Sequence, residues 1–381
     1  MSSHKPFISL CMIVRDEEAY LRRCLESFNG AYDELIVVDT GSQDRTVEIA
    51  REFDAQLGHF TWCDDFGSAK NYACSLAHGE WIIMPDGDEY LGPEGIGLRV
   101  PEMLRHVPHR LDKLLIEQRT LIKDDVITIL VDRIFRNRPE LRWKYRIHEV
   151  IEMSQERTAM TREFYLVHEN ALKRREDMRI SQEREQMYLR ALARDREEYP
   201  NDPRPAFYFA ETLCGANRHQ EALEAFGHYF HLSVGKEPAR RAVAFRDAAT
   251  SACALAQHER QRTLLFRSLA DDWRPAETYV ALAEMALKHN NRDEAIHWFT
   301  VAAGCKPSSD TFSISSAYGP QLFERLTALY REKGDESMAR KWADKAADLR
   351  GKVCMTSAHP KKRSAQTRRK KKQKKRSNVR T

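Results

Sequence analysis

The sequence predicts an α/β domain followed by an all-α domain of helical hairpins, with a disordered basic tail at the end. Short apolar runs alternate with helix-period segments over residues 7–150, whereas the pattern after Leu172 is wholly helical. Residues after Arg350 include 13 Lys or Arg and no acidic residue. A chain of 381 residues is too long for one ordinary compact unit. We therefore expect three parts, at residues 1–171, 172–350 and 351–381.

The first part begins with alternating strands and helices. Residues 7–14 form an apolar run of strand length, and a helical pattern then continues to Asn29-Gly30, which ends it. Asp44 stands where it can cap a helix over 46–53. The other expected elements are strands over 35–38, 81–84, 114–117 and 127–135 and a helix whose inner stripe is Ala69, Tyr72, Ala73 and Leu76.

Acidic residues follow two of these strands directly. Asp39 comes after the second strand, and Asp86 and Asp88 come after the strand over 81–84. Open α/β sheets bind ligands beyond the carboxyl ends of their strands, which is where these three residues should lie. Two carboxylates spaced two residues apart also suit one Mg²⁺ or Mn²⁺ shared with a diphosphate.

The helical part shows a repeated pattern. A long charged helix should end at Glu198, before a segment that contains two prolines. Similar starts of a second helix then recur at 221–223, 262–264, 294–296 and 337–339. Their spacing scatters around the 34-residue period of tetratricopeptide repeats, so we expect a short solenoid of helical hairpins. An irregular helical bundle is the alternative.

Several classes of protein are excluded. No apolar run approaches the length of about 20 residues that spans a bilayer. Four charged residues, 15–18, follow the first apolar run where a signal peptide needs a cleavage site, so we expect no secretion by that route. The eight cysteines are scattered without a Cys-x-x-Cys pair. We expect reduced thiols, no structural metal and a cytoplasmic protein.

The tail has a composition that cannot bury enough apolar surface to fold alone. Before it, 49 basic residues stand against 57 acidic ones, so positive charge is concentrated at the end of the chain. We expect the tail to bind nucleic acid or an anionic membrane surface without sequence preference. The alternatives are a solvated arm that aids solubility and a nuclear-import signal over 360–376.

Several ordered motifs carry a resemblance to a known family. The chain resembles the opening of family 2 glycosyltransferases over residues 8–18, 33–46, 62–66, 69–71 and 79–89. A later stretch, 136–149, resembles the subgroup that joins this domain to tetratricopeptide repeats. That subgroup includes bacterial and phage peptide-glycosylating enzymes and is similar to lipopolysaccharide-core glucosyltransferases.

The resemblance implies a GT-A fold that transfers a hexose with inversion. The donor would be a nucleoside-diphosphate sugar, UDP-glucose or a related sugar, and the cofactor Mg²⁺ or Mn²⁺. By this resemblance Asp16, Glu17 and Asp39 would contact the nucleoside. Asp86 would contact the ribose and contribute to the metal site, and Asp88 would bind the metal. The subgroup usually has Asn at the position of Asp16.

Four further residues have roles implied by the resemblance. Lys70, where the subgroup usually has Arg, would face the diphosphate, and His168 would complete the metal coordination. Glu149 would be the catalytic base, with His148 beside it. Simpler interpretations compete: Lys70 as a solvated helix lysine and His168 as a packed core residue. Glu149 could instead pair with Arg142 or Arg146.

The acceptor stays open on this evidence. A peptide or protein side chain would use the concave face of the repeats, and a nucleic acid with a hydroxymethylated base would use the tail. A glycan or lipid-linked saccharide would be met at a membrane surface. A noncatalytic scaffold built on the repeats is an interpretation from another class.

Overall fold

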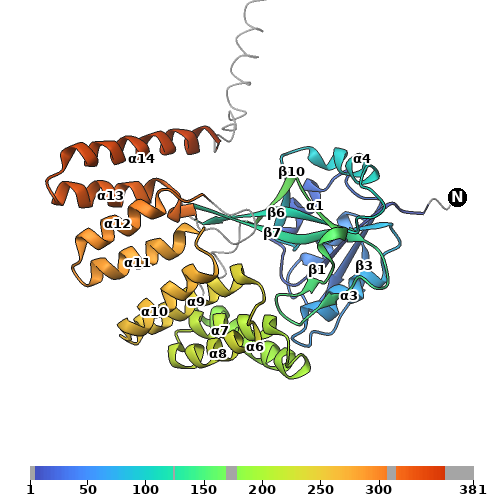
Figure 1. Cartoon of the computed structure of the whole chain (residues 1–381). Helices are drawn as coiled ribbons and strands as arrows, with labels where there is room; N and C mark the ends of the chain where they lie inside the picture. Colours follow the sequence, from blue (N-terminus) through green and yellow to red (C-terminus); the bar gives the residue numbers. More distant parts are fainter. Residues whose placement is uncertain (1–4, 123–124, 169–177, 307–314, 357–381) are drawn as a thin grey trace, which may run out of the picture. The chain divides into compact units, whose positions relative to one another are not determined.

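The computed structural model describes residues 5–122, 125–168, 178–306 and 315–356, and these form two compact units. The first unit runs from Met1 to Ala317 and contains a sheet part and a helical part, and the second runs from Tyr318 to Thr381 (Figure 1). The expected basic tail lies outside the described residues, except that the last helix continues to Thr356. Pro360 is the first helix-breaking residue after that helix.

The sheet part is built on eight strands in the order β3-β2-β1-β4-β7-β6-β10-β5. β1 pairs in parallel with β2 and β4, whereas β7 runs antiparallel to both β4 and β6. Its elements are β1 (Ile8–Val14), α1 (Leu21–Ser27), β2 (Glu34–Asp39), α2 (Thr46–Glu52), β3 (Gln56–His59), α3 (Phe66–Ser75), β4 (Trp81–Ile83), β5 (Glu89–Gly92), η1 (Ile96–Arg99), α4 (Val100–Arg105), β6 (Lys113–Ile122), β7 (Asp125–Arg136), β8 (Trp143–Lys144), β9 (Val150–Ile151), η2 (Gln155–Arg157) and β10 (Thr158–His168).

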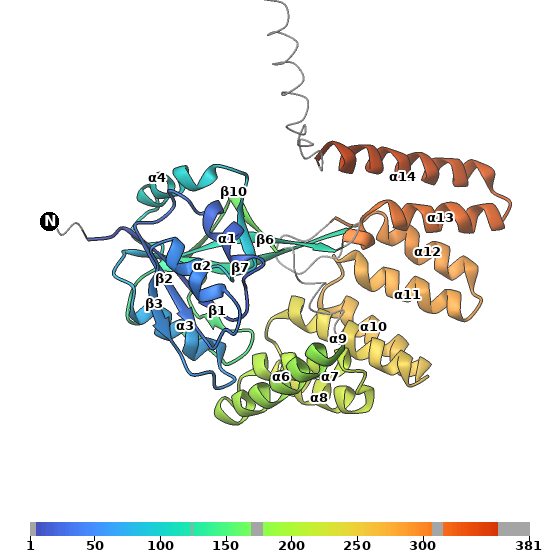
Figure 2. The same ribbon diagram turned by 180° about the vertical axis from the view of Figure 1, so that it is seen from behind.

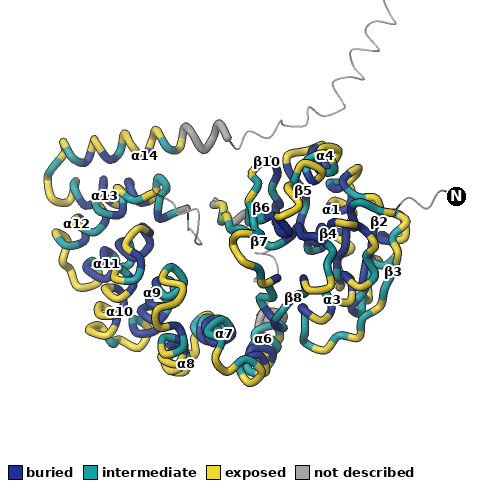
Figure 3. Tube along the Cα trace, turned by 45° about the vertical axis from the view of Figure 1, so that its right-hand side comes forward, coloured by how far each residue is buried: buried dark blue, intermediate teal, exposed yellow. Residues whose placement is uncertain are grey.

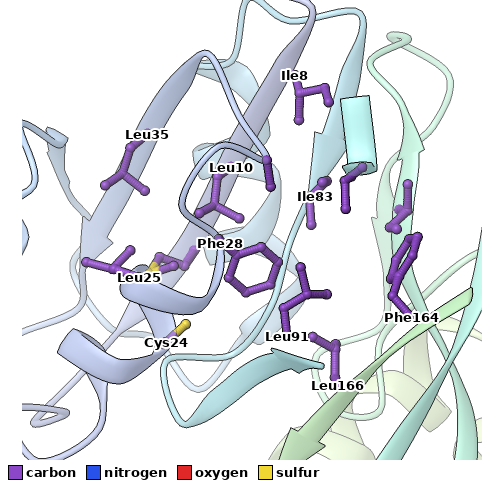
Figure 4. Packing of buried hydrophobic residues seen from close by; sticks show 14 of the residues in the cluster. Ile8, Leu10, Cys24, Leu25, Phe28, Leu35, Ile83, Leu91, Phe164 and Leu166 are labelled. Atoms are coloured by element: carbon purple, nitrogen blue, oxygen red, sulfur yellow. The ribbon is translucent and has the colours of Figure 1, made fainter. Parts of the chain in front are cut away.

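Two hydrophobic layers cover the two faces of this sheet. Alternate residues of β1 point to opposite sides, so Leu10 joins one layer and Cys11 the other. Helices α1, α2 and α4 pack on the Leu10 side, where Phe28 and Phe164 are fully buried (Figure 4). Helix α3 and the β8–β9 pair cover the opposite side. Because both faces are covered, β1 and β4 are almost wholly buried (Figure 3).

The helical part consists of a long helix followed by helical pairs. The helices of the first unit are α6 (Met178–Glu198), α7 (Pro203–Gly215), α8 (His219–Leu232), α9 (Pro238–Ala254), α10 (His258–Asp271), α11 (Ala276–Lys288) and α12 (Arg292–Ala302), with the short η3 (Ser315–Ala317). Consecutive helices pair as α7 with α8, α9 with α10 and α11 with α12 (Figure 2). The second unit holds one further pair, α13 (Pro320–Glu332) and α14 (Glu336–Thr356).

The expected hairpin pattern is confirmed. The four recurring starts fall in α8, α10, α12 and α14, which are the second helices of the four pairs. Apolar residues at helical spacing face the partner helices, and Phe226 and Tyr229 of α8 are fully buried. The irregular-bundle alternative is wrong, because the helices pack as consecutive pairs, α7 with α8, α9 with α10, α11 with α12 and α13 with α14. Among the described residues no helix is long and apolar enough to cross a membrane.

Several strands were not expected from the pattern. β3, β5 and β10 are mixed in polarity, and β10 exposes much of its first half. Asp44 accepts from the backbone nitrogen of Thr46 at 2.9 Å, but it stands one residue before the cap position of α2, which is Arg45. β3, β5 and β10 were missed because pairing with neighbouring strands, and not a run of apolar residues, holds them in the sheet.

Leu10→Ala should lower the free energy of unfolding by about 3 kcal/mol, because a fully buried leucine loses its packing and leaves a cavity. Leu98→Ala, the same change at a side chain that is 74% exposed, should cost less than about 0.5 kcal/mol. Denaturant unfolding of both variants measures the difference. Equal losses would show that the central strand is not the core of this part.

Candidate active site

The candidate site lies at the carboxyl ends of the parallel strands. β1 and β2 end in register, with Val14 opposite Asp39, and β4 runs parallel beside them. Asp16 and Asp86 therefore follow strands that end at the same edge of the sheet as Asp39. This is the edge at which open α/β sheets bind ligands.

Asp16 and Asp39 organise the loop that follows β2. The carboxylate of Asp39 accepts from the backbone nitrogens of Gly41 and Ser42, at 3.1 and 3.0 Å. The carboxylate of Asp16 accepts from the nitrogen of Gln43 at 2.7 Å, and its own nitrogen donates to Ser42 Oγ at 3.1 Å. Both acids thus hold the same short loop in one conformation. A role in contacting the nucleoside stays a prediction.

Glu17 lies against the loop that carries the two later aspartates. Its side chain is buried, and its backbone nitrogen donates to Thr46 Oγ1 at 2.7 Å. A Cβ atom at Gly87 would lie 3.0 Å from Cγ of Glu17. Glycine at this position therefore lets the β1 and β4 loops pack closely together.

A network of charged side chains surrounds Asp86. Lys70 Nζ lies 3.4 Å from Asp86 Oδ1, and Arg133 of β7 binds the other carboxylate oxygen. The same guanidinium binds Glu89 at 2.9 Å, and Gln118 of β6 also donates to Glu89. The network therefore joins α3, the loop after β4, β5, β6 and β7.

The network sets the charge of its members. Removal from water raises the pKa of Asp86, but Arg133 and Lys70 lower it by more, so the net pKa lies well below the usual range. Burial likewise raises the pKa of Glu89, and Arg133 offsets this only in part. Burial lowers the pKa of Arg133, but Asp86 and Glu89 raise it to a net increase. Arg133 therefore stays positive and Asp86 stays negative.

Lys70 is a buried lysine, so the alternative of a solvated helix residue is wrong. Only 2% of it is exposed, and its ammonium lies 4.7 Å from the centre of the Trp143 ring. It donates to Glu149 Oε1 at 2.6 Å while remaining close to Asp86. Burial lowers the pKa of Lys70, but the two carboxylates raise it to a net increase. One positive charge thus connects two of the predicted site residues.

Asp88 and His168 lie side by side. His168 Nε2 is 3.1 Å from Asp88 Oδ2, and the Asp88 side chain is almost fully buried. His168 is the last residue of β10, opposite Glu89 in the β5–β10 ladder. Burial lowers the pKa of His168, but Asp88 raises it to a net increase. The sheet register therefore brings together two residues 80 positions apart in the chain.

Asp88 and His168 carry ligand atoms that could hold a metal ion in part. In the part of the chain that the structure describes, no group of three or more His, Cys, Asp or Glu side chains is arranged to hold a metal ion. Asp88 and His168 supply two ligand atoms, while both oxygens of Asp86 lie against cations. Mg²⁺ is commonly bound by one or two carboxylates together with substrate phosphates. Asp88 and His168 would therefore fit a divalent metal only if a phosphate or other ligand supplied the remaining contacts.

Glu149 and His148 point into different surroundings. Glu149 binds Lys70, whereas Arg146 binds Asp195 and Glu198 of α6, so pairing of Glu149 with Arg146 is wrong. Arg142 donates to backbone oxygens, which removes the other alternative. Burial and then Arg204 and Arg240 lower the pKa of His148 to about 3, and its ring stacks on Tyr208 at 3.9 Å. Described contacts join only Glu149 to the charged network.

Arg133 and Glu89 are site residues that sequence reasoning missed. Arg133 precedes the buried Ile134 and Phe135 near the end of β7, and a buried arginine is a signal of a paired charge. Glu89 follows Asp88 directly and is fully buried, with its carboxylate bound by Arg133 and Gln118. Nothing in the sequence pairs these two residues, because their strands meet only in the folded sheet.

Arg133→Gln should lower the free energy of unfolding by about 3–5 kcal/mol, because it leaves the buried carboxylate of Glu89 without its cation. Adding Glu89→Gln to the same chain should restore part of that loss, since the uncompensated charge is then removed. Denaturant unfolding of the two single variants and the double variant measures the coupling. Strictly additive losses would contradict it.

Comparisons with known proteins agree with this architecture. A family model described as glycosyl transferase family 2 matches residues 9–109. A TPR repeat-containing protein of Synechococcus elongatus is 41% identical over 152 residues, which are 39% of this chain and 36% of that protein. Glycosyltransferase SunS of Bacillus phage SPbeta is 34% identical over 97 residues, 25% of this chain and 23% of that protein. The chain thus spans 36% and 23% of the lengths of these two relatives.

Among solved structures, the crystal structure of MamA aligns with 47% of this chain over 98% of its own chain, at 16% identity and a TM-score of 0.37.

The family match begins in β1 and ends after α4, so it includes the loops of Asp16, Asp39 and Asp86. The acidic residues at the carboxyl edge of the sheet thus lie inside the segment that the family model matches. The chain therefore carries a glycosyl transferase family 2 domain of GT-A fold, followed by TPR-like helical hairpins.

Proposed function

We propose that this protein is an inverting glycosyltransferase that moves a hexose from a nucleoside-diphosphate sugar, a UDP-sugar such as UDP-glucose, to an acceptor. The observation that carries the proposal is the buried link through Lys70, which connects Asp86 at the end of β4 with Glu149. It joins the proposed donor side of the site to the proposed base. The family 2 match over residues 9–109 supports glycosyl transfer in general.

The donor would lie along the carboxyl edge of the sheet. Asp16, Glu17 and Asp39 would contact the nucleoside and Asp86 the ribose, as in the family pattern. Lys70 and Arg133 already concentrate positive charge beside Asp86. Such preorganised cations stabilise the negative charge that develops on a leaving diphosphate.

A divalent cation, Mg²⁺ or Mn²⁺, would be held by Asp88 and His168, with Asp86 nearby and with the diphosphate as the remaining ligand. When bound it would act as a Lewis acid on the leaving group. Nε2 of His168 and Oδ2 of Asp88 are adjacent, at 3.1 Å, in a hydrogen bond. A metal would take the place of the proton that these two atoms share.

Glu149 would take the proton of the acceptor. A single displacement with inversion needs a base on the side of the sugar opposite the leaving group. The carboxylate of Glu149 is 14% exposed and is oriented by Lys70, so it is accessible and held in place. His148 would not be the base, because its ring packs on Tyr208 and its pKa is lowered to about 3 by burial and by Arg204 and Arg240.

The acceptor classes to screen follow from the rest of the chain. The helical hairpins suit a peptide or protein side chain, and the basic residues after Arg350 suit nucleic acid with a hydroxymethylated base. The same basic residues would suit a glycan acceptor at an anionic membrane surface. A noncatalytic scaffold is the competing function, and it should neither bind nor turn over a nucleotide sugar.

Asp88→Asn should reduce release of nucleoside diphosphate from the preferred nucleotide sugar by about 100-fold or more, because a buried metal ligand is lost. The assay compares a panel of nucleotide sugars with Mg²⁺, with Mn²⁺ and with a chelator, which should abolish turnover. Asp344→Asn, the same change at an exposed position on α14, is the matched control and should keep full activity.

Calorimetry measures donor binding separately from turnover. If the protein neither binds nor turns over any nucleotide sugar with either metal ion, the noncatalytic scaffold is favoured. Turnover that persists with a chelator would contradict the requirement for a divalent cation but not the proposed glycosyl transfer.

Glu149→Gln should lower kcat by about 10²–10⁴-fold, since the base is replaced by an amide that cannot accept the proton. The KM for the donor should change little, because the nucleoside and diphosphate contacts stay intact. Glu156→Gln, an exposed change in η2, provides the control. A donor KM that rises with unchanged kcat would assign Glu149 to binding instead.

A further inference from the structure

The segment that leads to Glu149 is held by the helical part of the same unit. The hydroxyl of Tyr145 donates to Asp202 at the start of α7, and Lys144 lies 3.3 Å from the same carboxylate. Ile147 is buried in a small apolar cluster with Ala191 and Leu192 of α6. Side chains of residues 144, 145 and 147 thus contact α6 or the start of α7.

Arg146 makes three further contacts with α6. Its guanidinium donates to Asp195 Oδ1 at 2.6 Å and to Glu198 at 2.7 Å. Its backbone nitrogen donates to the other oxygen of Asp195 at 2.9 Å. Asp195 lies within α6 and is completely buried, so one residue satisfies both of its oxygens. Such a pair is costly to break from either side.

The same backbone also contacts the helix that carries Lys70. The carbonyl oxygen of Arg146 accepts from the nitrogen of Phe66, the first residue of α3, at 2.9 Å. A Cβ atom at Gly67 would lie only 2.4 Å from the carbonyl oxygen of Tyr145. The segment is therefore packed tightly between the start of α3 and the helices α6 and α7.

Two contacts then fix the residue just before Glu149. Arg204 of α7 donates to the carbonyl oxygen of His148 at 2.9 Å, and the His148 ring stacks on Tyr208. His148 has a positive φ of 53°, so the chain turns sharply at this point. The His148 ring packs on α7, whereas the next side chain, Glu149, contacts Lys70.

We propose that Arg146 and Asp195 form a positioning pair through which the helical part holds Glu149 in its catalytic place. The first helices after the sheet part are then a component of the active site as well as a surface for the acceptor. This inference rests on the proposed function, because it assigns the pair a role through Glu149. Arg146 and Asp195 are positioning residues and touch no substrate.

The test is Asp195→Asn in the full-length chain, with the donor that the nucleotide-sugar panel identifies. Loss of the charge should loosen the segment and lower kcat for nucleoside-diphosphate release by about 10- to 100-fold, since displacement of a catalytic group by 1 Å can cost that much. The KM for the donor should stay within about threefold, because its predicted contacts lie on the β1, β2 and β4 loops.

Asp271→Asn is the matched control. Asp271 at the end of α10 pairs with Arg241 of α9 at 3.0 Å, and both side chains are mostly buried. This pair lies wholly within the repeats. Thermal unfolding of both variants establishes how much stability each loses. The control should lose stability with kcat within about twofold of the wild type, whereas Asp195→Asn should lose kcat in addition.

Arg204→Gln gives a second test should Asp195→Asn not fold. It removes the contact to the His148 carbonyl from a partly exposed side chain, and it should lower kcat with little change in donor KM. Unchanged kcat in a folded Asp195→Asn or Arg204→Gln variant would overturn the positioning role. Equal kcat losses in Asp195→Asn and the control would do the same. Absence of wild-type turnover and donor binding would instead overturn the proposed function itself.

Discussion

The buried ammonium of Lys70 is the interaction on which the arrangement of the site depends. It lies between the carboxylates of Asp86 and Glu149, which come from segments more than 60 residues apart. A buried ammonium is stable in its charged form only beside an anion, and Lys70 has two carboxylates beside it. Arg133 in the same way has Asp86 and Glu89 beside it. Without these two cations the loop after β4 would concentrate negative charge that burial disfavours.

A second group of contacts connects this network to the helices. Arg146 faces away from Glu149 and binds Asp195, so the segment between β8 and β9 is held by α6 and α7 on one side and by α3 on the other. The sheet part and the helical part of the first unit therefore share one packed segment. The pairs α9–α10 and α11–α12 are built by packing between helices that are neighbours in the chain.

Much of the fold was predictable because its signals are local. The strands at 8–14 and 34–39 are marked by apolar runs, which in the second strand cover 35–38, and the second helices of the pairs repeat a recognisable start. β3, β5 and β10 were not predictable in this way, since their polarity is mixed and they are stabilised by pairing with distant strands. Asp16, Asp39, Asp86 and Asp88 were predictable as candidates because each follows a strand end or belongs to a motif. Arg133 and Glu89 were not, because no pattern links β7 to the residue after Asp88.

Local sequence alone specified the strand ends, the acidic residues after them and the alternation of helices in pairs, because hydrophobic period and turn residues act over a few positions. Only the tertiary structure decided which side chains form ion pairs with each other. Glu149 could bind Arg142, Arg146 or Lys70 by chemistry alone, and the packing of α3 against the β8–β9 segment selects Lys70. The same packing leaves Arg146 facing α6. Charge complementarity is not specific between pairs, so the backbone geometry of the folded chain determines which carboxylate each cation meets.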